Sequence, residues 1–376
     1  MRTRLAVLEA FFFSVSLLGG CAGGGTTPPP VQTQTAAPTI TTADALGGAE
    51  MVTMASPTSG AAVYYTIDGT TPTSSSQVYA GPFLVASNLT INAIATATGD
   101  KNSTVTTKAF AANIPSGTLV WSDEFNNSTR ANVAPDPKVW GYDTGLDCCG
   151  NNELETYCAA TGATVTAPCD PANPNAYVGT DHVLHIVARN PSSKVYTSAR
   201  LKSEGLFSFQ YGRIEAKLKI PESQSMWPAF WLLGNNISTD PWPACGELDV
   251  MEHINGNNSP MSVGAAAPGY DWTQSSVHGT GLNGGNPFHP AGFSAAAWHI
   301  YGMIWSKGQV QYYVDDPTNI YETFTATGMA GTWPFDQGPE FVILNLAVGG
   351  DWPGSPDSTT VFPSEFLVDY VRVYAN

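Results

Sequence analysis

Residues 246–253 read GELDVMEH. Three carboxylates stand in this hydrophobic run, at Glu247, Asp249 and Glu252. On a β-strand Glu247 and Asp249 share a face, because successive side chains point to opposite faces. Glu252 is out of step with them unless a β-bulge at positions 250–251 absorbs one extra residue and turns it back. The stretch therefore predicts a buried, bulged strand with three acids on one face.

Outward from this strand, residues 118–376 show many strand-like runs and little helical periodicity. Six of the runs are VLHIVA (183–188), FSFQYGRIEAKLKI (207–220), HIYGMIWS (299–306), QVQYYVD (309–315), FVILNLAVG (341–349) and FLVDYVRVY (366–374). So many strands in one region predict an all-β domain with two packed antiparallel sheets of jelly-roll type. A curved sheet of this kind offers a concave face for an extended polymer.

Two glutamates on such a face suit glycoside hydrolysis. Glu247 and Glu252 side chains that converge to about 5–5.5 Å would form the carboxyl pair of a retaining glycosidase. Asp249, between them, would hydrogen-bond the nucleophile and help to keep the acid protonated. The alternatives are an acidic edge strand or a calcium site. The apolar residues that alternate with the acids favour a buried strand instead.

The motif GELDVMEHING resembles the signature of glycoside hydrolase family 16, in the Glu-x-Asp-x-x-Glu form typical of laminarinase-like endo-β-1,3-glucanases. Further blocks resemble the family in the same order along the chain: LVWSDEFN, GNNELETYC, YTSARLKSEGLFSFQYGRIEAKLKIP, MWPAFWLLG and ILNLAVGGDWPGSPDSTTVFPSEFLVDYVRVY. The resemblance implies a β-jelly-roll and retaining hydrolysis of β-1,3-glucan without a cofactor. It implies Glu247 as nucleophile, Asp249 as assisting acid and Glu252 as acid/base.

Several other residues are candidates for substrate binding. Trp227 and Trp231 flank the residues PAF, and aromatic rings stack on sugar faces. Core packing is the alternative for Trp231. Four more residues match family positions near the cleft: Asn152, Arg200, His278 and Trp352. We do not expect His278 to bind zinc, because none of the six histidines shows ligand spacing.

A structural calcium ion is a further expectation, because family 16 enzymes often carry one away from the cleft. The resemblance places candidate ligands at both ends of the domain, Glu124 in SDEF and Asp369 in LVDYV. The backbone carbonyl of His182 would complete an oxygen-rich set of the kind that calcium prefers. The alternative is that Glu124 makes a surface contact and Asp369 a hydrogen bond to a neighbouring loop.

The N-terminus predicts export. Arg2 and Arg4 precede the apolar stretch LAVLEAFFFSVSLLGG, which is followed by Cys21. The sequence LLGGC resembles a bacterial lipoprotein signal, so residues 1–20 would be a signal peptide and Cys21 the lipidated N-terminus. Residues 21–37 are rich in Gly, Pro and Thr and predict a flexible tether. We expect an anchor in the outer membrane or cell surface, with ordinary secretion as the alternative.

Residues 38–113 have a different texture, with short alternating strands such as AEMVTMA (49–55), AAVYYTI (61–67) and STVTTKAF (103–110). They predict a small antiparallel β-sandwich. The run VYYTIDGTTPTSSSQVYAGPF resembles the immunoglobulin-like module at the C-terminus of chitobiases, which implies an accessory role. Tyr64, Tyr65 and Tyr79 could stack on sugars, but strand tyrosines more often pack, and we favour packing.

Composition agrees with this organisation and excludes other classes. The chain has 376 residues, of which 43% are hydrophobic and 12% charged, and a formal net charge of −16. That charge argues against binding nucleic acid, whose phosphates would be repelled. We expect a monomer acting on a neutral glycan. In an oxidising compartment Cys158 and Cys169 are the best candidates for a disulfide, and the odd number of cysteines besides Cys21 leaves at least one free or paired with another molecule.

Two other functions stay open at this stage. The same fold and mechanism could act on mixed-linkage β-glucan or on a galactan, although scarce Lys and Arg disfavour sulfated galactans. Alternatively, the protein could bind glycans without cleaving them. The presence of all three acids makes this second reading weaker.

Overall fold

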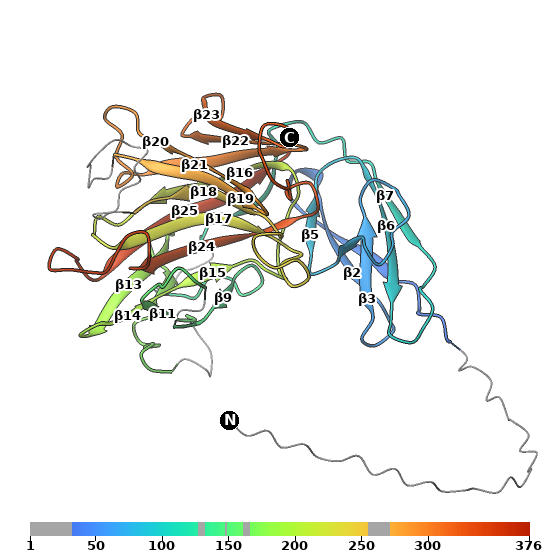
Figure 1. Ribbon diagram of the computed structural model, residues 1–376, viewed down its shortest axis with the longest axis horizontal. Helices are drawn as coiled ribbons and strands as arrows, with labels where there is room; N and C mark the ends of the chain where they lie inside the picture. The colour runs from blue at the N-terminus through green and yellow to red at the C-terminus, as the bar shows by residue number, and fades with distance from the viewer. Residues whose placement is uncertain (1–31, 127–131, 147–148, 161–165, 255–270) are drawn as a thin grey trace, which may run out of the picture.

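The computed structural model describes residues 32–126, 132–146, 149–160, 166–254 and 271–376, and this part of the chain is all β apart from one 3-10 turn (Figure 1). The elements are β1 (Thr39–Asp44), η1 (Leu46–Gly48), β2 (Glu50–Ala55), β3 (Ala62–Thr66), β4 (Gln77–Val78), β5 (Phe83–Val85), β6 (Leu89–Thr96), β7 (Thr106–Phe110), β8 (Leu119–Asp123), β9 (Gly141–Asp143), β10 (Gly145–Leu146), β11 (Glu155–Tyr157), β12 (Ala176–Val178), β13 (Leu184–Ser192), β14 (Val195–Ser198), β15 (Arg200–Lys202), β16 (Gly212–Lys219), β17 (Met226–Gly234), β18 (Glu247–Glu252), β19 (Thr273–Gly279), β20 (Leu282–Phe288), β21 (His299–Ser306), β22 (Gln309–Val314), β23 (Ile320–Thr325), β24 (Glu340–Val348) and β25 (Ser364–Tyr374).

The first seven strands form the small β-sandwich that the sequence predicts. One sheet has the order β1-β2-β5 and the other β4-β3-β6-β7. Their facing side chains make a separate core that includes Val52, Ile91 and Phe83. Tyr65 is buried in this core and stacks on Phe83 with 5.3 Å between the ring centroids. Tyr65 therefore packs, as we expected, and is not a sugar platform.

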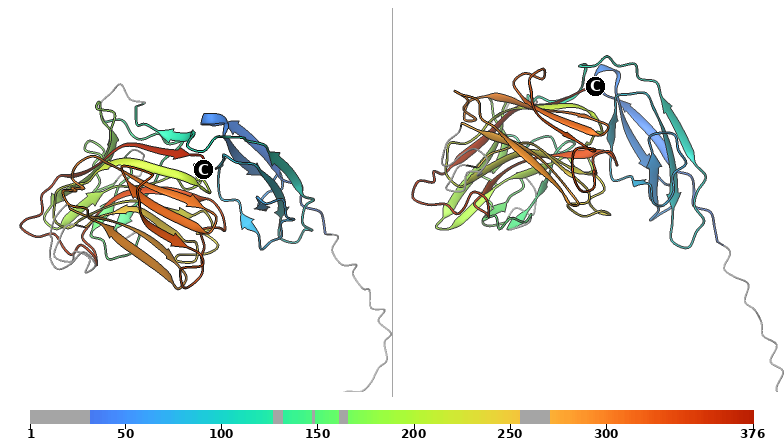
Figure 2. Two further views of the ribbon diagram at one scale, coloured as in Figure 1. Left: turned by 90° about the horizontal axis from the view of Figure 1, so that it is seen from above. Right: turned by 45° about the horizontal axis from the view of Figure 1, so that its top comes forward.

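The larger domain is a sandwich of two antiparallel sheets, which confirms the predicted jelly-roll class. A seven-stranded sheet has the order β20-β19-β18-β17-β24-β15-β9. An eleven-stranded sheet covers its other side, with β13, β25, β16 and β21 near the middle. β8 pairs with β25, so the first strand of this domain lies beside the last. Figures 1 and 2 show the small sandwich beside one end of the larger domain.

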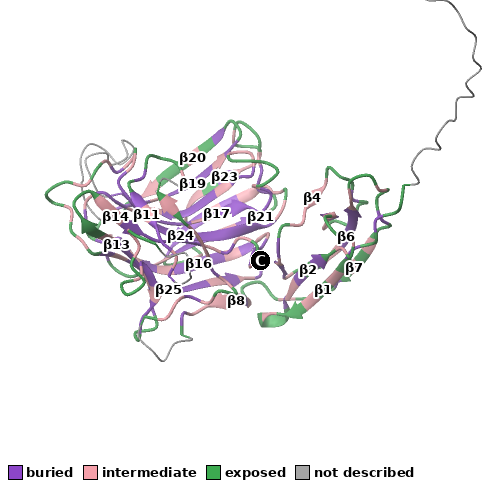
Figure 3. Ribbon diagram, turned by 90° about the horizontal axis from the view of Figure 1, so that it is seen from below, coloured by how far each residue is buried: buried purple, intermediate pink, exposed green. Residues whose placement is uncertain are grey.

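The main core lies between these two sheets. β24 lies in the middle of the seven-stranded sheet, between β17 and β15, and is buried at every position. Figure 3 shows the buried residues concentrated along β17 and β24, whereas β1 and β7 at the outer side of the small sandwich are largely exposed. The opposite face of the seven-stranded sheet is thereby free to form a cleft.

The predicted bulge is present in β18. Trp231 pairs with Asp249 and Phe230 with Met251, so Val250 is the extra residue opposite β17. Val250 and Met251 are consecutive, yet both belong to the main core. Two successive residues on the core side break the alternation once, which returns the next residue to the cleft side.

Other expectations have mixed outcomes. Cys158 and Cys169 form the predicted disulfide, and Cys245 is a free, buried cysteine. Residues 1–20 and Cys21 lie outside the described residues, so the signal peptide and lipid anchor stay predictions. Within the described ranges no helix has the length and apolar character needed to cross a membrane.

Candidate active site

The strand register places the functional side chains in rows across the cleft face of the seven-stranded sheet. Directly opposed residues of antiparallel strands point to the same face. The row through Glu252 contains Asp143, Arg200, Asn345, Ala229, Glu252 and Gln274. The next row contains Trp231, Asp249 and Ser276, and the third contains Leu233, Glu247 and His278. All of these residues line one cleft of about 1000 Å³.

The three predicted acids therefore lie together. Asp249 is nearly inaccessible, with 2% of its surface exposed, whereas Glu247 and Glu252 are partly open to the cleft. The Trp227 Nε1–H donates a hydrogen bond of 3.0 Å to Glu252 Oε1. His278 Nε2 lies 3.2 Å from Asp249 Oδ2 and 3.9 Å from Glu247 Oε1. The indole of Trp227 thus orients the acid/base candidate, and the imidazole faces the other two acids.

Crowding and burial shift the pKa values of all three acids upwards. Burial, and then the charge of Asp249, raise the pKa of Glu247 to about 8, while His278 and Trp242 act in the opposite direction. Burial and the charge of Glu247 raise the pKa of Glu252 to about 7 against the hydrogen bond from Trp227. Burial and the charge of Glu252 raise the pKa of Asp249 well above its usual range. The cluster consequently retains protons at neutral pH.

Aromatic rings form the walls of the cleft. Trp227 and Trp352 meet edge to face with 5.3 Å between centroids, and Trp231 lies on the floor. Trp242, in the loop between β17 and β18, also lines the cleft and is 57% exposed. Sequence reasoning missed Trp242; its position four residues before the GELDVMEH motif was the available signal. Exposed indoles around a groove are suited to stacking on sugar rings.

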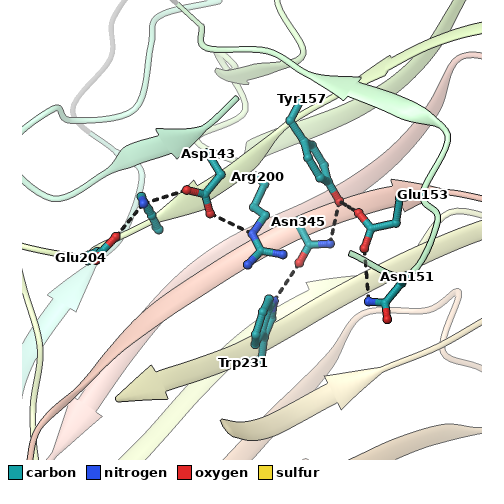
Figure 4. Close-up of polar contacts among 9 residues, drawn as sticks. Asp143, Asn151, Glu153, Tyr157, Arg200, Glu204, Trp231 and Asn345 are labelled. Carbon is teal, nitrogen blue, oxygen red and sulfur yellow. Dashed lines mark hydrogen bonds and ion pairs between the residues drawn. The ribbon is translucent and has the colours of Figure 1, made fainter. Parts of the chain in front are cut away.

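A polar network holds the floor of the cleft in place (Figure 4). Trp231 Nε1–H donates to Asn345 Oδ1 at 2.7 Å, and Asn345 Nδ2–H donates to the Tyr157 hydroxyl at 3.2 Å. That hydroxyl donates to Glu153 Oε2 at 2.9 Å. The Arg200 guanidinium lies 4.6 Å from the centre of the Trp231 ring. Trp231 thus faces the cleft and is fixed by hydrogen bonds, which a plain core residue would not need.

Arg200 has a second partner, because its Nε–H donates to Asp143 Oδ2 at 3.0 Å. Asn345, Tyr157 and Glu153 were not predicted as site residues. Asn345 had a signal, since it interrupts the apolar run FVILNLAV of β24. Tyr157 and Glu153 had none, because the pair reaches the cleft floor through Asn345, which lies 188 residues from Tyr157.

Asn152 is placed differently from the expectation. Its Nδ2 donates to both Asp351 carboxylate oxygens at 3.0 Å, which ties two loops at one end of the cleft. Its neighbour Asn151 is the residue that lines the cleft. Asn151 and Asn152 both have positive φ angles, 61° and 53°, a backbone region that asparagine tolerates better than most residues. Asn152 therefore shapes the loop, while Asn151 faces the substrate space.

The candidate calcium ligands do not fit a shared ion as they are arranged. Both Glu124 oxygens accept hydrogen bonds from Arg372, each at 2.8 Å. Asp369 Oδ2 pairs with Lys217 Nζ at 2.7 Å. His182 lies in the turn before β13. Each carboxylate already has a cationic partner, so the geometry does not favour calcium between them, and the ion stays a prediction.

One set of potential metal ligands does converge within the described residues. Ligand atoms of Glu247, Asp249 and His278 lie within 4.8 Å of one another. Two of these three are the acids that the cleft presents to a substrate. A cation bound there would neutralise the carboxylates and compete with the substrate, so the donor set does not suit a resident cofactor.

Comparison with known proteins agrees with this geometry. The model for glycosyl hydrolases family 16 matches residues 168–372, and that for the chitobiase/beta-hexosaminidase C-terminal domain matches residues 41–107. A beta-glucanase of Rhodothermus marinus is 35% identical over 271 residues, 69% of this chain and 86% of the relative. A keratan-sulfate endo-1,4-beta-galactosidase of Sphingobacterium multivorum is 32% identical over 68% of this chain, which spans only 54% of that relative.

A solved structure is also similar. The catalytic domain of an endo-1,3-beta-glucanase (laminarinase) from Thermotoga petrophila RKU-1 matches with a TM-score of 0.56 and 35% identity, over 69% of this chain and 98% of that one. The family model extends over the bulged strand β18 and over β17, β19 and β24 of the cleft. The chain belongs to glycosyl hydrolases family 16.

Proposed function

We propose that the protein is a retaining endo-β-1,3-glucanase. The observation that carries the proposal is the bulged strand β18, which brings Glu247, Asp249 and Glu252 onto one face of an aromatic-lined cleft. The cleft is open and long enough to involve strands from β9 to β19, as an enzyme that cuts within a chain requires. The laminarinase that resembles this chain supports the choice of linkage.

The chemistry follows the two-carboxylate scheme for retention of configuration. Glu252 protonates the glycosidic oxygen as the bond to the anomeric carbon breaks, and Glu247 attacks that carbon to form a covalent glycosyl-enzyme. Glu252, now ionised, then takes a proton from water, which attacks the same carbon and releases Glu247. Trp227 holds the Glu252 carboxyl in position through its Nε1–H.

The first step needs an ionised Glu247 beside a protonated Glu252. Burial and the charge of Asp249 hold the pKa of Glu247 at about 8, above the value of about 7 for Glu252, so Glu247 must give up its proton before it can attack. A neutral Asp249, whose pKa burial raises well above its usual range, does not oppose the charge that Glu247 then carries. Once Glu247 is ionised, burial and the charge of Glu247 keep the pKa of Glu252 at about 7, so Glu252 can hold the proton for the glycosidic oxygen near neutral pH.

The charges around the cleft favour a neutral glycan. Arg200 is the arginine among the cleft residues, and Asp143 already neutralises it at 3.0 Å. Among the described residues, the cleft therefore offers no free guanidinium for sulfate groups, which bidentate arginine would recognise best. This argues against sulfated galactans, although one relative carries the name of a keratan-sulfate galactosidase.

Product analysis on four polymers tests the proposal. Laminarin, lichenan, agarose and carrageenan are incubated separately with the full chain, and the products are sized and their anomeric configuration is followed by NMR. We expect short oligosaccharides of several lengths from laminarin, released with the β configuration. Cleavage of lichenan alone would move the assignment to mixed-linkage glucan. Products with the α configuration would remove the retaining mechanism.

We also propose that the enzyme is exported and lipid-anchored through Cys21. The support is the sequence LLGGC followed by a Gly- and Pro-rich tether. Expression in a bacterial host with fractionation of the envelope tests this. The wild type should appear in membranes, and the Cys21→Ser variant should be soluble and fully active. A wild-type protein found only in the soluble fraction would contradict the anchor.

A further inference from the structure

The small sandwich is attached to the larger domain by backbone pairing. The Leu84 N–H of β5 donates to Ser208 O at 2.9 Å. The next residue, Phe209, exchanges two backbone hydrogen bonds with Glu340 at the start of β24, at 2.9 and 3.1 Å. Ala49 and Leu84 also belong to the main core of the larger domain. The two domains therefore meet at a fixed boundary, which lies beside β5 in Figure 1.

The two backbones approach each other very closely next to this pairing. A Cβ on Gly81 would lie 2.6 Å from the Cα of Gly205 and 2.9 Å from its carbonyl carbon. Both distances are too short for real atoms in a packed interior, so a larger residue at position 81 must push the two segments apart. Position 81 is therefore a place where the boundary can be opened from the side of the small sandwich.

The Ser208 hydroxyl joins the small sandwich to Asn235 of the larger domain. Its Oγ donates to Pro82 O at 3.0 Å and accepts a hydrogen bond of 2.7 Å from Asn235 Nδ2. A hydroxyl has one hydrogen, so donation to Pro82 leaves the lone pairs of Oγ to accept from Asn235. Ser208 and Asn235 expose only 1% and 6% of their surface, which keeps water from replacing a lost partner. We call these two hydrogen bonds the Ser208 contact.

Asn235 is the first residue of the connection between β17 and β18, residues 235–246, which we call the cleft loop. Its backbone N–H donates to Pro339 O at 3.0 Å. Further along the loop, Ile237 and Trp242 line the catalytic cleft. The Trp242 side chain also hydrogen-bonds Glu247, which lowers the pKa of that acid against the effect of burial. The loop thus extends from the domain boundary to the candidate nucleophile.

Hydrogen bonds close successive turns within the cleft loop. The Thr239 N–H donates to Asn236 O at 2.8 Å, and the Ala244 N–H donates to Pro241 O at 2.9 Å. A loop closed in this way moves largely as a unit. A displacement at its first residue is therefore carried to Trp242.

The middle of the cleft loop packs less closely on the small sandwich. A cavity of about 260 Å³ lies between residues 75–78 of the small sandwich and Asn236, Thr239 and Asp240 of the loop. The Ser208 contact therefore provides support that this part of the boundary does not.

We propose that the small sandwich holds the cleft loop in place through the Ser208 contact and so preorganises Trp242 for binding the polysaccharide. Ser208 and Asn235 are positioning residues, because they act through Trp242. A loop that is already ordered costs less to order when the polymer binds, which increases affinity. The small sandwich thereby contributes to substrate binding without touching a sugar. The inference rests on the proposed function for the identity of the polysaccharide.

Kinetics of two variants test the proposal from opposite sides of the boundary. Gly81→Ala displaces Pro82 from the small-sandwich side, and Ser208→Ala removes the hydroxyl. Each should raise KM for laminarin about fivefold, as expected for a lost hydrogen bond. kcat should stay within about twofold, because the bound polymer restores the loop at the expense of binding energy. Unchanged KM in both variants would overturn the proposal. If Gly81→Ala is poorly folded by circular dichroism, Ser208→Ala decides alone.

Two control variants weaken the small sandwich or the boundary and keep the Ser208 contact. Gly60→Ala, between β2 and β3, is strained by a φ of 71°, but its Cβ would have nothing within 4 Å. Leu84→Ala removes a core side chain and keeps the backbone bond to Ser208. Both should lower the melting temperature and leave KM near the wild-type value. Equal increases in KM in the controls and the test variants would overturn the proposal, because general loosening would then explain them.

Hydrogen exchange provides a measurement that needs no substrate. Amide exchange of residues 237–246, followed by mass spectrometry, reports how often the cleft loop opens. Ser208→Ala should increase this exchange about fivefold, whereas Leu84→Ala should leave it close to wild type. Wild-type exchange of the loop in Ser208→Ala would overturn the proposal.

The two proposals can fail separately. If the wild type does not cut laminarin, the β-1,3 assignment fails, and hydrogen exchange still tests the Ser208 contact. If laminarin is cut and neither KM nor exchange changes in Ser208→Ala, only the role of the small sandwich fails.

Discussion

Buried acids on the two sheets of the larger domain are arranged in opposite ways. Glu215 of β16, on the eleven-stranded sheet, has 5% of its surface exposed and is fully paired. It forms an ion pair with Arg213 and accepts hydrogen bonds from Tyr313 at 2.7 Å and Tyr374 at 3.0 Å. Its charge is therefore compensated by a cation and two hydroxyls.

The cleft acids of β18 have no such compensation. Within the described residues their ion-pair partner is His278, and neither lysine nor arginine contacts them. Their nearest charged neighbours are one another, which raises their pKa values. Glu215, which links three strands of one sheet, is neutralised by its partners. The acids of the cleft are instead left in a protonated, energetically unfavourable cluster, as acids that exchange protons with a substrate are.

The largest expected effect is on kcat, and it should distinguish the catalytic acids of the cleft from the structural acid Glu215. Glu247→Gln should lower kcat by about 10⁴-fold or more, and Glu252→Gln by about 10²–10⁴-fold, because each removes half of the carboxyl pair. Glu215→Gln is the matched control and should keep near wild-type activity. Laminarin hydrolysis measured on folded protein decides the matter. Substantial turnover by either cleft variant would contradict the catalytic role of the acid that was replaced.

Stability should respond to pH through the cleft acids. The pKa of Glu247 is about 8 in the folded chain against 4.5 in the unfolded one, so the folded state binds more protons between these values. Its contribution to stability is complete below pH 4.5 and is lost as pH rises towards 8. The unfolding free energy should fall by on the order of 5 kcal/mol over this window. Urea unfolding of Glu247→Gln should show a flatter pH profile, and an equally steep one would contradict the pKa.

Glu215 should matter for stability at every pH near neutrality. Glu215→Gln leaves Arg213 without its counterion and weakens the hydrogen bonds from two tyrosines. We expect a loss of about 1–3 kcal/mol in the free energy of unfolding. Urea unfolding at pH 7 measures it, with Glu247→Gln expected to change in the opposite direction. A neutral effect would show that the ion pair adds nothing.

A smaller effect concerns the proton on Glu252. Trp227→Phe removes the N–H that favours the ionised form, so the pKa of Glu252 should rise above about 7. The alkaline limb of kcat/KM should then move up by about half to one pH unit. The dependence of kcat/KM on pH, measured with a soluble oligosaccharide, reports the shift in this pKa. Loss of stacking between residue 227 and the sugar would by itself raise KM without moving the alkaline limb. If the alkaline limb does not move, a group other than Glu252 determines it.

The smallest expected effect concerns calcium. Glu124 and Asp369 are paired with Arg372 and Lys217, in the manner of Glu215. Because both carboxylates already have cationic partners, we expect a chelator to leave the melting temperature unchanged. Differential scanning calorimetry with and without chelator tests this. A clear decrease in the melting temperature would restore the calcium site that the sequence resemblance implies.

Strong apolar periodicity made most strands predictable. The runs at 299–306, 309–315 and 341–349 correspond to β21, β22 and β24. β19 and β20 were not predicted, since TQSSVHG and LNGGNPF are polar or glycine-rich. Their place in the sheet depends on pairing with β18 and with each other, which local propensity does not encode.

The sequence by itself determined the all-β class, the two sandwiches, the disulfide and the bulged acidic strand. Each of these depends on alternation, turn residues or spacing within about a dozen positions. Even the direction in which Glu252 points followed from counting residues.

Only the tertiary structure decided how the cleft floor is held and where the two domains meet. Asn345 and Tyr157 are 188 residues apart, and Ser208 and Pro82 are 126 apart. The raised pKa values likewise come from burial and from neighbours assembled by the sheet. Such contacts arise from strand register and packing between distant segments, so they appear only when the chain is folded.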